Sequence, residues 1–377
     1  MQDLHVAQER RTSAASQREV PFGSNEVRLS PRQWLIALVI LAALFHYLPI
    51  IWQWIEPLQL GPDHRIPLRL SNDYWTYQRY CGEVCRQGRT LLLGDSVVWG
   101  HYVKSSETLS HYLNQQTGSQ RFANVGVDGI HPAAMAGLVE YYGRDMANQK
   151  VILSCNLLWM SSKQHDLSTE KEFVFNHPAL VPQFSPRIPC YRAKFPERLG
   201  IVIGRTVPLL GWADHLRIAL LESNDLPHWV IEHPYACSPG GLEMAAPYEP
   251  SPVPDAKPWT EQHIAKFNAA WVPLDASLQW QSFRRTVGLL RQRGNRLLVL
   301  LGPFNEHMLP EKSLETYRER QRGVEAWLRA EQIPHYIPPA LPSRLYADAS
   351  HPLAEGYARL AEDLCAQQSF RRFEAEP

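Results

Sequence analysis

Four short segments of the chain hold side chains of the kinds that carry out nucleophilic acyl chemistry. They are Gly94-Asp-Ser96, Asn124-Val-Gly-Val-Asp-Gly129, the stretch around Asn156, and Asp348-Ala-Ser-His351. A serine hydroxyl becomes an effective nucleophile when a neighbouring base takes its proton, and a carboxylate can fix the tautomer of a histidine base. Amide and backbone N–H groups can stabilise the negative oxygen that forms on attack. The chain therefore contains the residue types for serine-based acyl chemistry.

The residues around these segments alternate between strand-like and helix-like patterns. Strands are expected at 90–93, 122–126, 151–155, 297–301 and 335–337, and helices at 106–117, 133–147, 281–293, 312–331 and 353–366. Such alternation predicts an α/β fold in which helices cover both faces of a parallel sheet. Sites in these sheets lie beyond the carboxyl ends of the strands. Each of the four segments follows a predicted strand, so we expect them to meet there.

Taken in order, the four segments resemble the sequence blocks of the SGNH, or GDSL-type, serine hydrolase superfamily, which contribute Ser, Gly, Asn and an Asp-x-x-His pair. The resemblance covers about residues 88–158 and 281–367. It implies a flavodoxin-like, three-layer α/β/α fold with a parallel sheet. It also implies that Ser96 is the nucleophile, that His351 is the general base oriented by Asp348, and that neither metal nor cofactor is needed.

The same resemblance assigns an oxyanion hole to the backbone N–H groups of Ser96 and Gly129 and the side-chain amide of Asn156. Asp95 is expected to be a structural hydrogen-bonding residue in the nucleophile turn. The third block departs from the family pattern, because Ser154-Cys-Asn-Leu157 stands where Gly-x-Asn-Asp is usual. This departure argues against the best-known secreted esterase branch and leaves the catalytic residues in place.

A second Asp-x-x-His-Pro motif, Asp128-Gly-Ile-His131-Pro132, lies in the glycine block. The order of the blocks favours His351 as the base, because the family's Asp-x-x-His pair precedes the final helix. We expect His131 either to contact substrate at the rim of the pocket or to cap the next helix. Asn305 and His307 follow the fourth predicted strand, where they could bind substrate or belong to a loop with satisfied polar groups.

A different segment is typical of a transmembrane anchor. The run from Gln33 to Ile55 contains no Asp, Glu, Lys or Arg, with Trp34 near one end and Trp52 and Trp54 near the other. It is long enough to cross about 30 Å of hydrocarbon. Its length argues against a buried globular helix, and the lack of a small-residue cleavage site argues against a signal peptide. More arginines precede the run than follow it closely, which predicts a cytoplasmic N-terminus and an extracytoplasmic body.

The composition excludes two classes of protein. With 45% hydrophobic and 20% charged residues among its 377, the chain is not wholly disordered. Its 38 basic and 38 acidic residues cancel, which excludes a nucleic-acid binder that needs a positive field. The expected organisation is a cytoplasmic tail (1–32), the anchor (33–55), a linker (56–87), two halves of the catalytic domain (88–160 and 281–370) separated by an insertion (161–280), and a frayed end (371–377).

The insertion holds 15 of the 30 prolines. A helix is expected over about 199–221, either as an ordinary cap or as an amphipathic segment that touches the membrane or a membrane partner. Tyr235–Pro258 is expected to be an extended loop. The tryptophans of the insertion could contact sugar rings or form a core. Among six cysteines, Cys81 and Cys85 are close enough for a local disulfide, although the pairing stays open.

These features predict a membrane-tethered, serine-dependent acyl-ester enzyme. Its architecture is similar to that of accessory proteins of extracytoplasmic polysaccharide O-acetylation and teichoic-acid D-alanylation, which work beside a membrane-bound O-acyltransferase. The similarity implies an esterase or O-acetyltransferase acting on O-acetyl groups of cell-envelope polysaccharide. Two alternatives stay open, namely a non-enzymatic glycan-binding or scaffold protein on the same frame, and a membrane-proximal lipid esterase.

Overall fold

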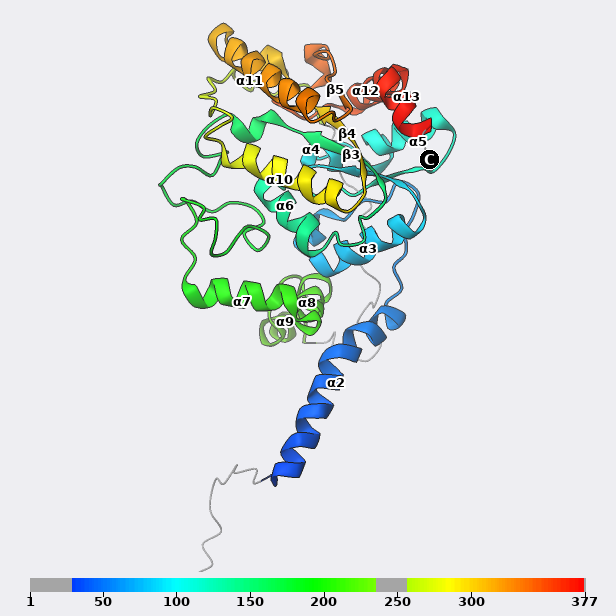
Figure 1. Ribbon diagram of the computed structural model, residues 1–377, viewed down its shortest axis with the longest axis vertical. Helices are drawn as coiled ribbons and strands as arrows, with labels where there is room; N and C mark the ends of the chain where they lie inside the picture. The colour runs from blue at the N-terminus through cyan, green and yellow to red at the C-terminus, as the bar shows by residue number, and fades with distance from the viewer. Residues whose placement is uncertain (1–28, 235–255, 376–377) are drawn as a thin grey trace, which may run out of the picture. The chain divides into compact units, whose positions relative to one another are not determined.

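The computed structural model describes residues 29–234 and 256–375, and the chain forms two compact units, 1–48 and 49–377. The second unit is built on a parallel sheet of five strands in the order β2-β1-β3-β4-β5 (Figure 1). The strands are β1 Thr90–Leu93, β2 Phe122–Asn124, β3 Lys150–Cys155, β4 Arg296–Leu301 and β5 His335–Tyr336. The sheet confirms the α/β prediction, and its strand order is the one found in flavodoxin-like folds.

Helices cover both faces of this sheet. On one face lie α3 Tyr74–Arg86, α6 Pro132–Tyr141, α10 Leu278–Gln292 and α11 Glu311–Ala330, and on the other α5 Leu109–Thr117, α12 Ala354–Ala366 and α13 Gln368–Ala375. The strands are apolar on both sides, so their side chains alternate between two cores: Leu91 and Leu93 join the first, and Leu92 joins the second.

Two of the expected boundaries are wrong. The segment 56–87 is not a linker, because α3 buries Tyr77, Tyr80 and Val84 in the core, and Asp73 caps the helix by accepting from the N–H of Thr76. These positions recur at helical spacing, which places them on one face of α3. The end of the chain is not frayed as far as it is described, because Phe370 and Phe373 of α13 are buried.

Helix α2 (Pro31–Ile55) is long and apolar enough to cross a membrane by length and composition. It begins two residues before the expected anchor and ends at the expected residue. Only Pro49 among its residues is buried. The first compact unit ends at Leu48, so the last turns of α2 belong to the second unit.

The insertion forms short helices joined by irregular segments. They are α7 Phe195–Thr206, α8 Pro208–His215, a π-helical turn Leu216–Leu220 and α9 Leu226–Glu232. The single helix expected over 199–221 is broken at Val207, because the residue before a proline is driven out of the helical conformation. Most of the loop expected at Tyr235–Pro258 lies outside the described residues.

Most tryptophans of the insertion and most of the described cysteines are core residues. Within the insertion, Trp229, Trp259, Trp271 and Trp280 are buried and Trp212 is half-buried, which favours the core interpretation over contact with sugar rings. Cysteines 81 and 85 lie one turn apart on α3 with their Sγ atoms 4.0 Å from each other. They and the other described cysteines are free thiols.

Candidate active site

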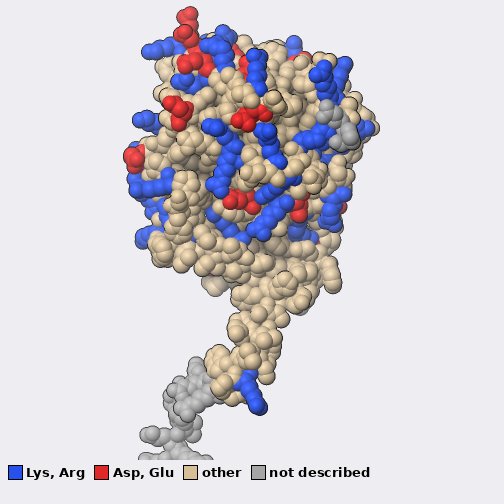
Figure 2. Space-filling model, in the orientation of Figure 1, with Lys and Arg blue, Asp and Glu red and all other residues tan. Residues whose placement is uncertain are grey.

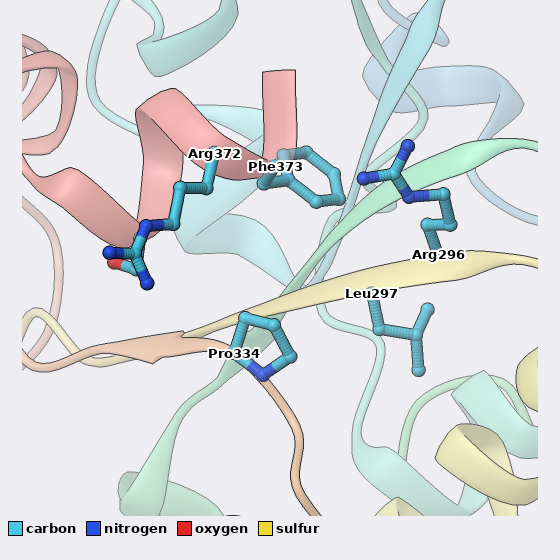
Figure 3. A pocket seen from close by; sticks show the side chains of 6 residues that line it. Arg296, Leu297, Pro334, Arg372 and Phe373 are labelled. Atoms are coloured by element: carbon cyan, nitrogen blue, oxygen red, sulfur yellow. The ribbon is translucent and has the colours of Figure 1, made fainter. Parts of the chain in front are cut away.

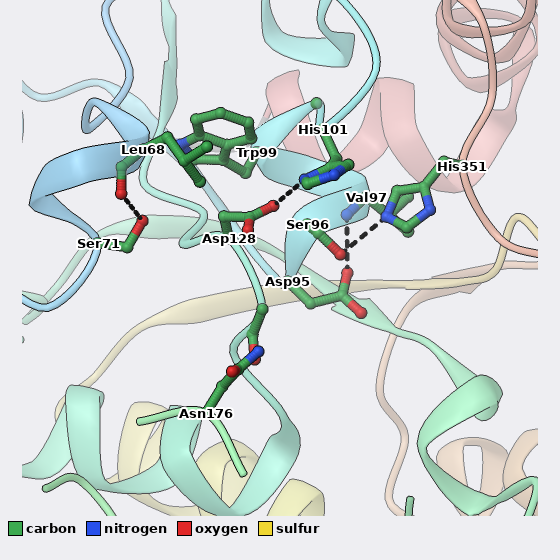
Figure 4. A network of polar contacts seen from close by, with 12 residues as sticks. Leu68, Ser71, Asp95, Ser96, Val97, Trp99, His101, Asp128, Asn176 and His351 are labelled. Atoms are coloured by element: carbon green, nitrogen blue, oxygen red, sulfur yellow. Dashed lines mark hydrogen bonds and ion pairs between the residues drawn. The ribbon is translucent and has the colours of Figure 1, made fainter. Parts of the chain in front are cut away.

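Ser96 is the first residue of a single helical turn, α4 (Ser96–Trp99), directly after β1. Asp95 caps this turn by accepting from the N–H of Val97, and Gly100 ends it in the left-handed conformation with φ 89°. A side chain at Gly94 would stand 2.3 Å from the Val98 side chain, so the close packing beneath the serine requires glycine. The sequence thus forms a tight strand-to-helix turn that presents Ser96 at the carboxyl end of the sheet (Figure 4).

His351 lies within hydrogen-bond distance of Ser96. Its Nε2 is 2.8 Å from the Ser96 Oγ, and its Nδ1 is 2.8 Å from both carboxylate oxygens of Asp348. Asp348 Oδ1 also accepts from the backbone N–H groups of Ser350 and His351, at 2.9 and 3.0 Å. The three-residue spacing therefore folds the carboxylate back onto its own histidine, and the structure joins Asp348, His351 and Ser96 in one continuous chain of hydrogen bonds.

The surroundings of Asp348 keep it ionised. Burial acts to raise the pKa of this carboxyl, but the hydrogen bonds from His351 and from the backbone N–H groups of Ser350 and His351 outweigh burial and lower the pKa below its ordinary value. An ionised Asp348 accepts the Nδ1–H of His351, which leaves Nε2 as the acceptor for the Ser96 hydroxyl. This is the protonation state that a general base requires.

Asn156 and Gly129 are tied to the nucleophile turn. The Asn156 amide donates to Asp95 Oδ2 at 2.8 Å, and Trp159 Nε1 donates to the same oxygen at 2.8 Å. An amide carries two hydrogens, so one remains for a reacting oxygen. Asp95 therefore has the structural role expected of it. The loop that carries Gly129 is joined to the same turn, since the N–H of Val127 donates to the carbonyl oxygen of Gly94 at 3.1 Å.

Gly129 occupies a position that favours glycine. Its φ is 67°, and a Cβ there would stand 2.4 Å from Nδ2 of Asn176, the end of a flexible side chain that would have to move. The positive φ favours glycine at this point after β2, at the same end of the sheet as Ser96.

His131 is not at a pocket rim, and this alternative of the sequence prediction is corrected. The side chain is buried and caps α6, with Nδ1 accepting from the N–H of Ala134 and Nε2 donating to the carbonyl oxygen of Asn176 at 3.2 Å. Burial, with a contribution from His177, lowers the pKa of His131 to about 3, so the ring is neutral. The residue has the alternative role of a helix cap.

Asn305 and His307 hold the loop that carries Asp348. Asn305 is fully buried and its amide donates to the Asp348 carbonyl oxygen at 2.9 Å, so it does not reach a substrate surface and the prediction of contact is wrong. His307 Nε2 lies 3.0 Å from the carbonyl oxygen of Leu341. The ring of His307 is exposed, so substrate contact by His307 stays a prediction.

A second His–Asp pair near Ser96 was not expected from the sequence. His101 Nδ1 lies 2.6 Å from Asp128 Oδ1, and the His101 ring centroid lies 5.6 Å from that of His351 (Figure 4). The hydrogen bond to Asp128 raises the pKa of His101 above its ordinary value, against the effect of burial. Asp128 belongs to the second Asp-x-x-His motif, yet its partner is a histidine 27 residues earlier, a pairing that spacing alone does not reveal.

A hollow among the described residues at the other end of the sheet carries no such chemistry. It has a volume of about 380 Å³ and is lined by Leu297, Pro334, Phe373 and Arg372 (Figure 3). Leu297 lies in the first part of β4 and Pro334 just precedes β5, so this hollow is at the amino ends of the strands, opposite Ser96. Among the residues that the structure describes, no group of three His, Cys, Asp or Glu side chains could hold a metal ion.

Comparison with known proteins did not identify a family for this chain. Neither the protein-family models nor the curated proteins gave a match to this chain. The assignment of the site therefore depends on the geometry described above.

Proposed function

We propose that this chain is a serine acyl-ester enzyme of the SGNH type, with Ser96 as nucleophile, His351 as general base and Asp348 as the residue that orients the base. The observation that carries the proposal is the unbroken hydrogen-bond chain from Asp348 through His351 to Ser96. It lies at the carboxyl ends of the strands, where the strand order reverses between β1 and β3.

In the acylation step, Ser96 Oγ attacks the carbonyl carbon of an ester while its proton passes to Nε2 of His351 along the hydrogen bond that joins the two atoms, which are 2.8 Å apart. Asp348 stabilises the imidazolium that results. The carbonyl oxygen becomes an oxyanion, for which the backbone N–H groups of Ser96 and Gly129 and the free amide hydrogen of Asn156 are the candidate donors. Collapse breaks the ester C–O bond, and the leaving alcohol takes its proton from His351.

In the second step, an incoming hydroxyl attacks the acyl group on Ser96. His351 takes the proton of that hydroxyl and returns a proton to Ser96 Oγ as the acyl–oxygen bond breaks, which restores the enzyme. Water as the incoming group gives hydrolysis, and a sugar hydroxyl gives transfer. The same residues serve both reactions, so the acceptor alone distinguishes an esterase from an O-acetyltransferase.

The proposed substrates are O-acetyl groups of cell-envelope polysaccharide, with the body outside the cytoplasm. Helix α2 supports a membrane anchor, and the larger number of arginines before it supports a cytoplasmic N-terminus. The substrate class and a membrane-bound O-acyltransferase partner follow from the similarity of architecture to the O-acetylation accessory proteins.

The test is acetyl-ester turnover by the full chain in detergent micelles. Ser96→Ala is expected to lower kcat/KM by roughly 10⁴-fold or more, as when the nucleophile of a triad is removed. Ser161→Ala is the matched control, because the Ser161 Oγ is also hydrogen-bonded to a histidine, His165 Nδ1, at 2.7 Å, in a pair that has no carboxylate on it. Equal rates of acetyl-ester turnover for wild type and Ser96→Ala would refute the proposal that the chain is a serine-dependent enzyme.

A second measurement assigns the acceptor and the substrate class. The full chain is incubated with an acetylated oligosaccharide, and acetyl groups are followed into water or onto an unacetylated oligosaccharide. Acetate release supports an esterase, and acetylated acceptor supports a transferase. Cleavage of a lipid ester in mixed micelles with no action on the sugar ester would replace polysaccharide by lipid as the substrate class.

A further inference from the structure

Helix α7 exposes its apolar side chains. Phe195, Leu199 and Ile203 recur at every fourth position, which places them along one side of the helix, and they are 66%, 40% and 42% exposed. None of the residues of α7 is buried. Side chains built at Gly200 and Gly204, on the adjoining side of the helix, would meet nothing within 4 Å, so that side is open as well.

Two charged side chains of the same helix, Arg198 and Arg205, point into the protein, while Glu197 in its first turn is exposed. Arg198 donates to the carbonyl oxygens of Gln183 and Tyr191, and Arg205 donates to those of Ala179 and Val181. The Arg205 guanidinium also lies 4.4 Å from the ring centroid of Tyr141.

A helix on a water-facing surface turns its apolar stripe toward the core and its charges to solvent. The exposure of Phe195, Leu199 and Ile203 on α7 is therefore unfavourable in water. It is favourable where the surroundings of the helix are apolar.

The two following helices also expose apolar side chains. Leu210 of α8 is 38% exposed, and Leu226 and Ile231 of α9 are 59% and 76% exposed. We call Phe195, Leu199, Ile203, Leu210, Leu226 and Ile231 the cap apolar surface. On the face drawn in Figure 2, charged side chains are sparse at the lower end of the globular unit, where Figure 1 places α7, α8 and α9.

The last residues of α2 are fixed to this part of the insertion. Trp52 packs edge-on against Trp212 of α8, with ring centroids 5.5 Å apart. His215, the last residue of α8, bridges Glu56 and Asp73 through hydrogen bonds of 2.7 Å, and all three side chains are fully buried. These residues all belong to the second compact unit. A buried, ionic contact of this kind fixes α8 beside the end of the apolar run.

The C-terminal end of α2 carries residues that are typical of a membrane–water interface. Trp52 and Trp54 stand there, and Trp54 is 82% exposed. Tryptophan favours the headgroup level of a bilayer. The cap apolar surface adjoins the point where the apolar run leaves the bilayer, which identifies lipid as the apolar surroundings of α7.

We propose that the cap apolar surface lies in the interfacial layer of the membrane, as a contact separate from the span of α2. Helices of this kind bury their apolar face about 5–10 Å into the boundary between headgroups and acyl chains. The inference rests on the proposed membrane insertion of α2 and not on the chemistry of Ser96. With two contacts, the body is held in one orientation on the bilayer instead of turning freely on a tether.

The experiment uses the full chain in phosphatidylcholine nanodiscs, with an environment-sensitive fluorophore on single introduced cysteines. The background replaces Cys237 and Cys365 by serine, because the other cysteines are buried. Leu199→Cys and Ile231→Cys report on the cap apolar surface, Leu41→Cys on the middle of the α2 span, and Glu319→Cys on the solvent-exposed side of helix α11. Lipids with a nitroxide at the headgroup or on the acyl chain are the quenchers.

The labels at positions 199 and 231 are expected to lose more than half of their emission to lipid nitroxides near the headgroup, while the label at 319 keeps its emission. Quenching at 41 without quenching at 199 and 231 would overturn this inference and leave the anchor intact. A blue-shifted but unquenched label at 199 would also overturn it, because a protein partner or a second copy would then cover the surface. An unquenched label at 41 would overturn both the anchor and the inference, with acetyl-ester turnover still testing the enzyme independently.

Discussion

Replacing Asp348 by asparagine would test the role of the carboxylate in the hydrogen-bond chain. Asp348 Oδ1 accepts from two backbone N–H groups, and Oδ2 faces Nδ1 of His351 at 2.8 Å. Asparagine can keep the backbone contacts through its own Oδ1. Its NH₂ group then faces Nδ1, so His351 must accept there and carry its proton on Nε2. The ring would present a donor to Ser96 Oγ where the reaction needs an acceptor.

The expected loss of kcat is large although asparagine and aspartate have nearly the same shape. Inverting the tautomer in an equivalent triad lowers kcat by about 10⁴, which corresponds to about 5 kcal/mol of transition-state stabilisation. The fold should be almost unaffected, because both backbone hydrogen bonds to residue 348 are retained. Asp348→Asn should therefore separate activity from stability.

The assay is acetyl-ester turnover beside thermal unfolding, both with the full chain in micelles. Asp63→Asn is the matched control, because Asp63 Oδ2 pairs with Nδ1 of His111 at 2.8 Å in a His–Asp pair that does not involve Ser96. We expect Asp63→Asn to keep wild-type kcat. A folded Asp348→Asn protein within tenfold of wild type, or equal losses in the two variants, would refute the role given to Asp348.

Four further predictions concern other parts of the structure. His131→Ala should lower the free energy of unfolding by about 1–3 kcal/mol, through the lost cap and the unpaired Asn176 carbonyl, and leave the kcat of the folded protein within a few-fold of wild type; a loss of kcat as large as that of His351→Ala would contradict the helix-cap role. Gly129→Ala should cost about 1–2 kcal/mol because its φ is 67°, and unchanged denaturant unfolding would show that the loop relaxes freely. Phe370→Ala should cost about 3–5 kcal/mol, since Phe370 is buried and stacks on Phe122; a change below 1 kcal/mol would show that the start of α13 does not pack stably on the core. Burial opposes the charge on His215, but the hydrogen bonds that its ring donates to Asp73 and Glu56 raise its pKa to about 9. The stability it contributes is fully present below its unfolded pKa of about 6.5 and is lost as the pH rises through about 9, so thermal unfolding should show a falling Tm over that window in wild type and a flatter profile in His215→Gln.

The sheet could be predicted because its strands are short apolar runs that end in residues of distinct chemistry. The apolar run Leu91–Leu93 is typical of a buried parallel strand, and the turn after it is typical of a catalytic site. The order of the blocks predicted that Asp348 and His351 lie together, and they do, because a pair three residues apart can form its own hydrogen bond without help from the rest of the fold.

What the sequence did not predict depends on contacts between distant residues. Helix α3 looked like a linker because Tyr77 and Tyr80 are interspersed with polar residues, and its buried face is recognisable only against the sheet. The sequence could not distinguish a helix cap at His131 from a residue at the pocket rim. The carbonyl oxygen that accepts a hydrogen bond from the His131 ring belongs to Asn176, which lies far along the chain. The pairing of Asp128 with His101 likewise arises from the meeting of two loops after different strands.

The most direct test of the central claim is the site of covalent labelling by a serine-reactive phosphonate. The full chain in micelles is treated with the reagent, digested, and analysed by peptide mass spectrometry. The structure predicts one adduct, on Ser96, that disappears in Ser96→Ala, falls sharply in His351→Ala and persists in Ser161→Ala. No adduct on Ser96 in the folded wild-type protein, or the same labelling of Ser96 in wild type and His351→Ala, would contradict the catalytic role of this hydrogen-bond chain.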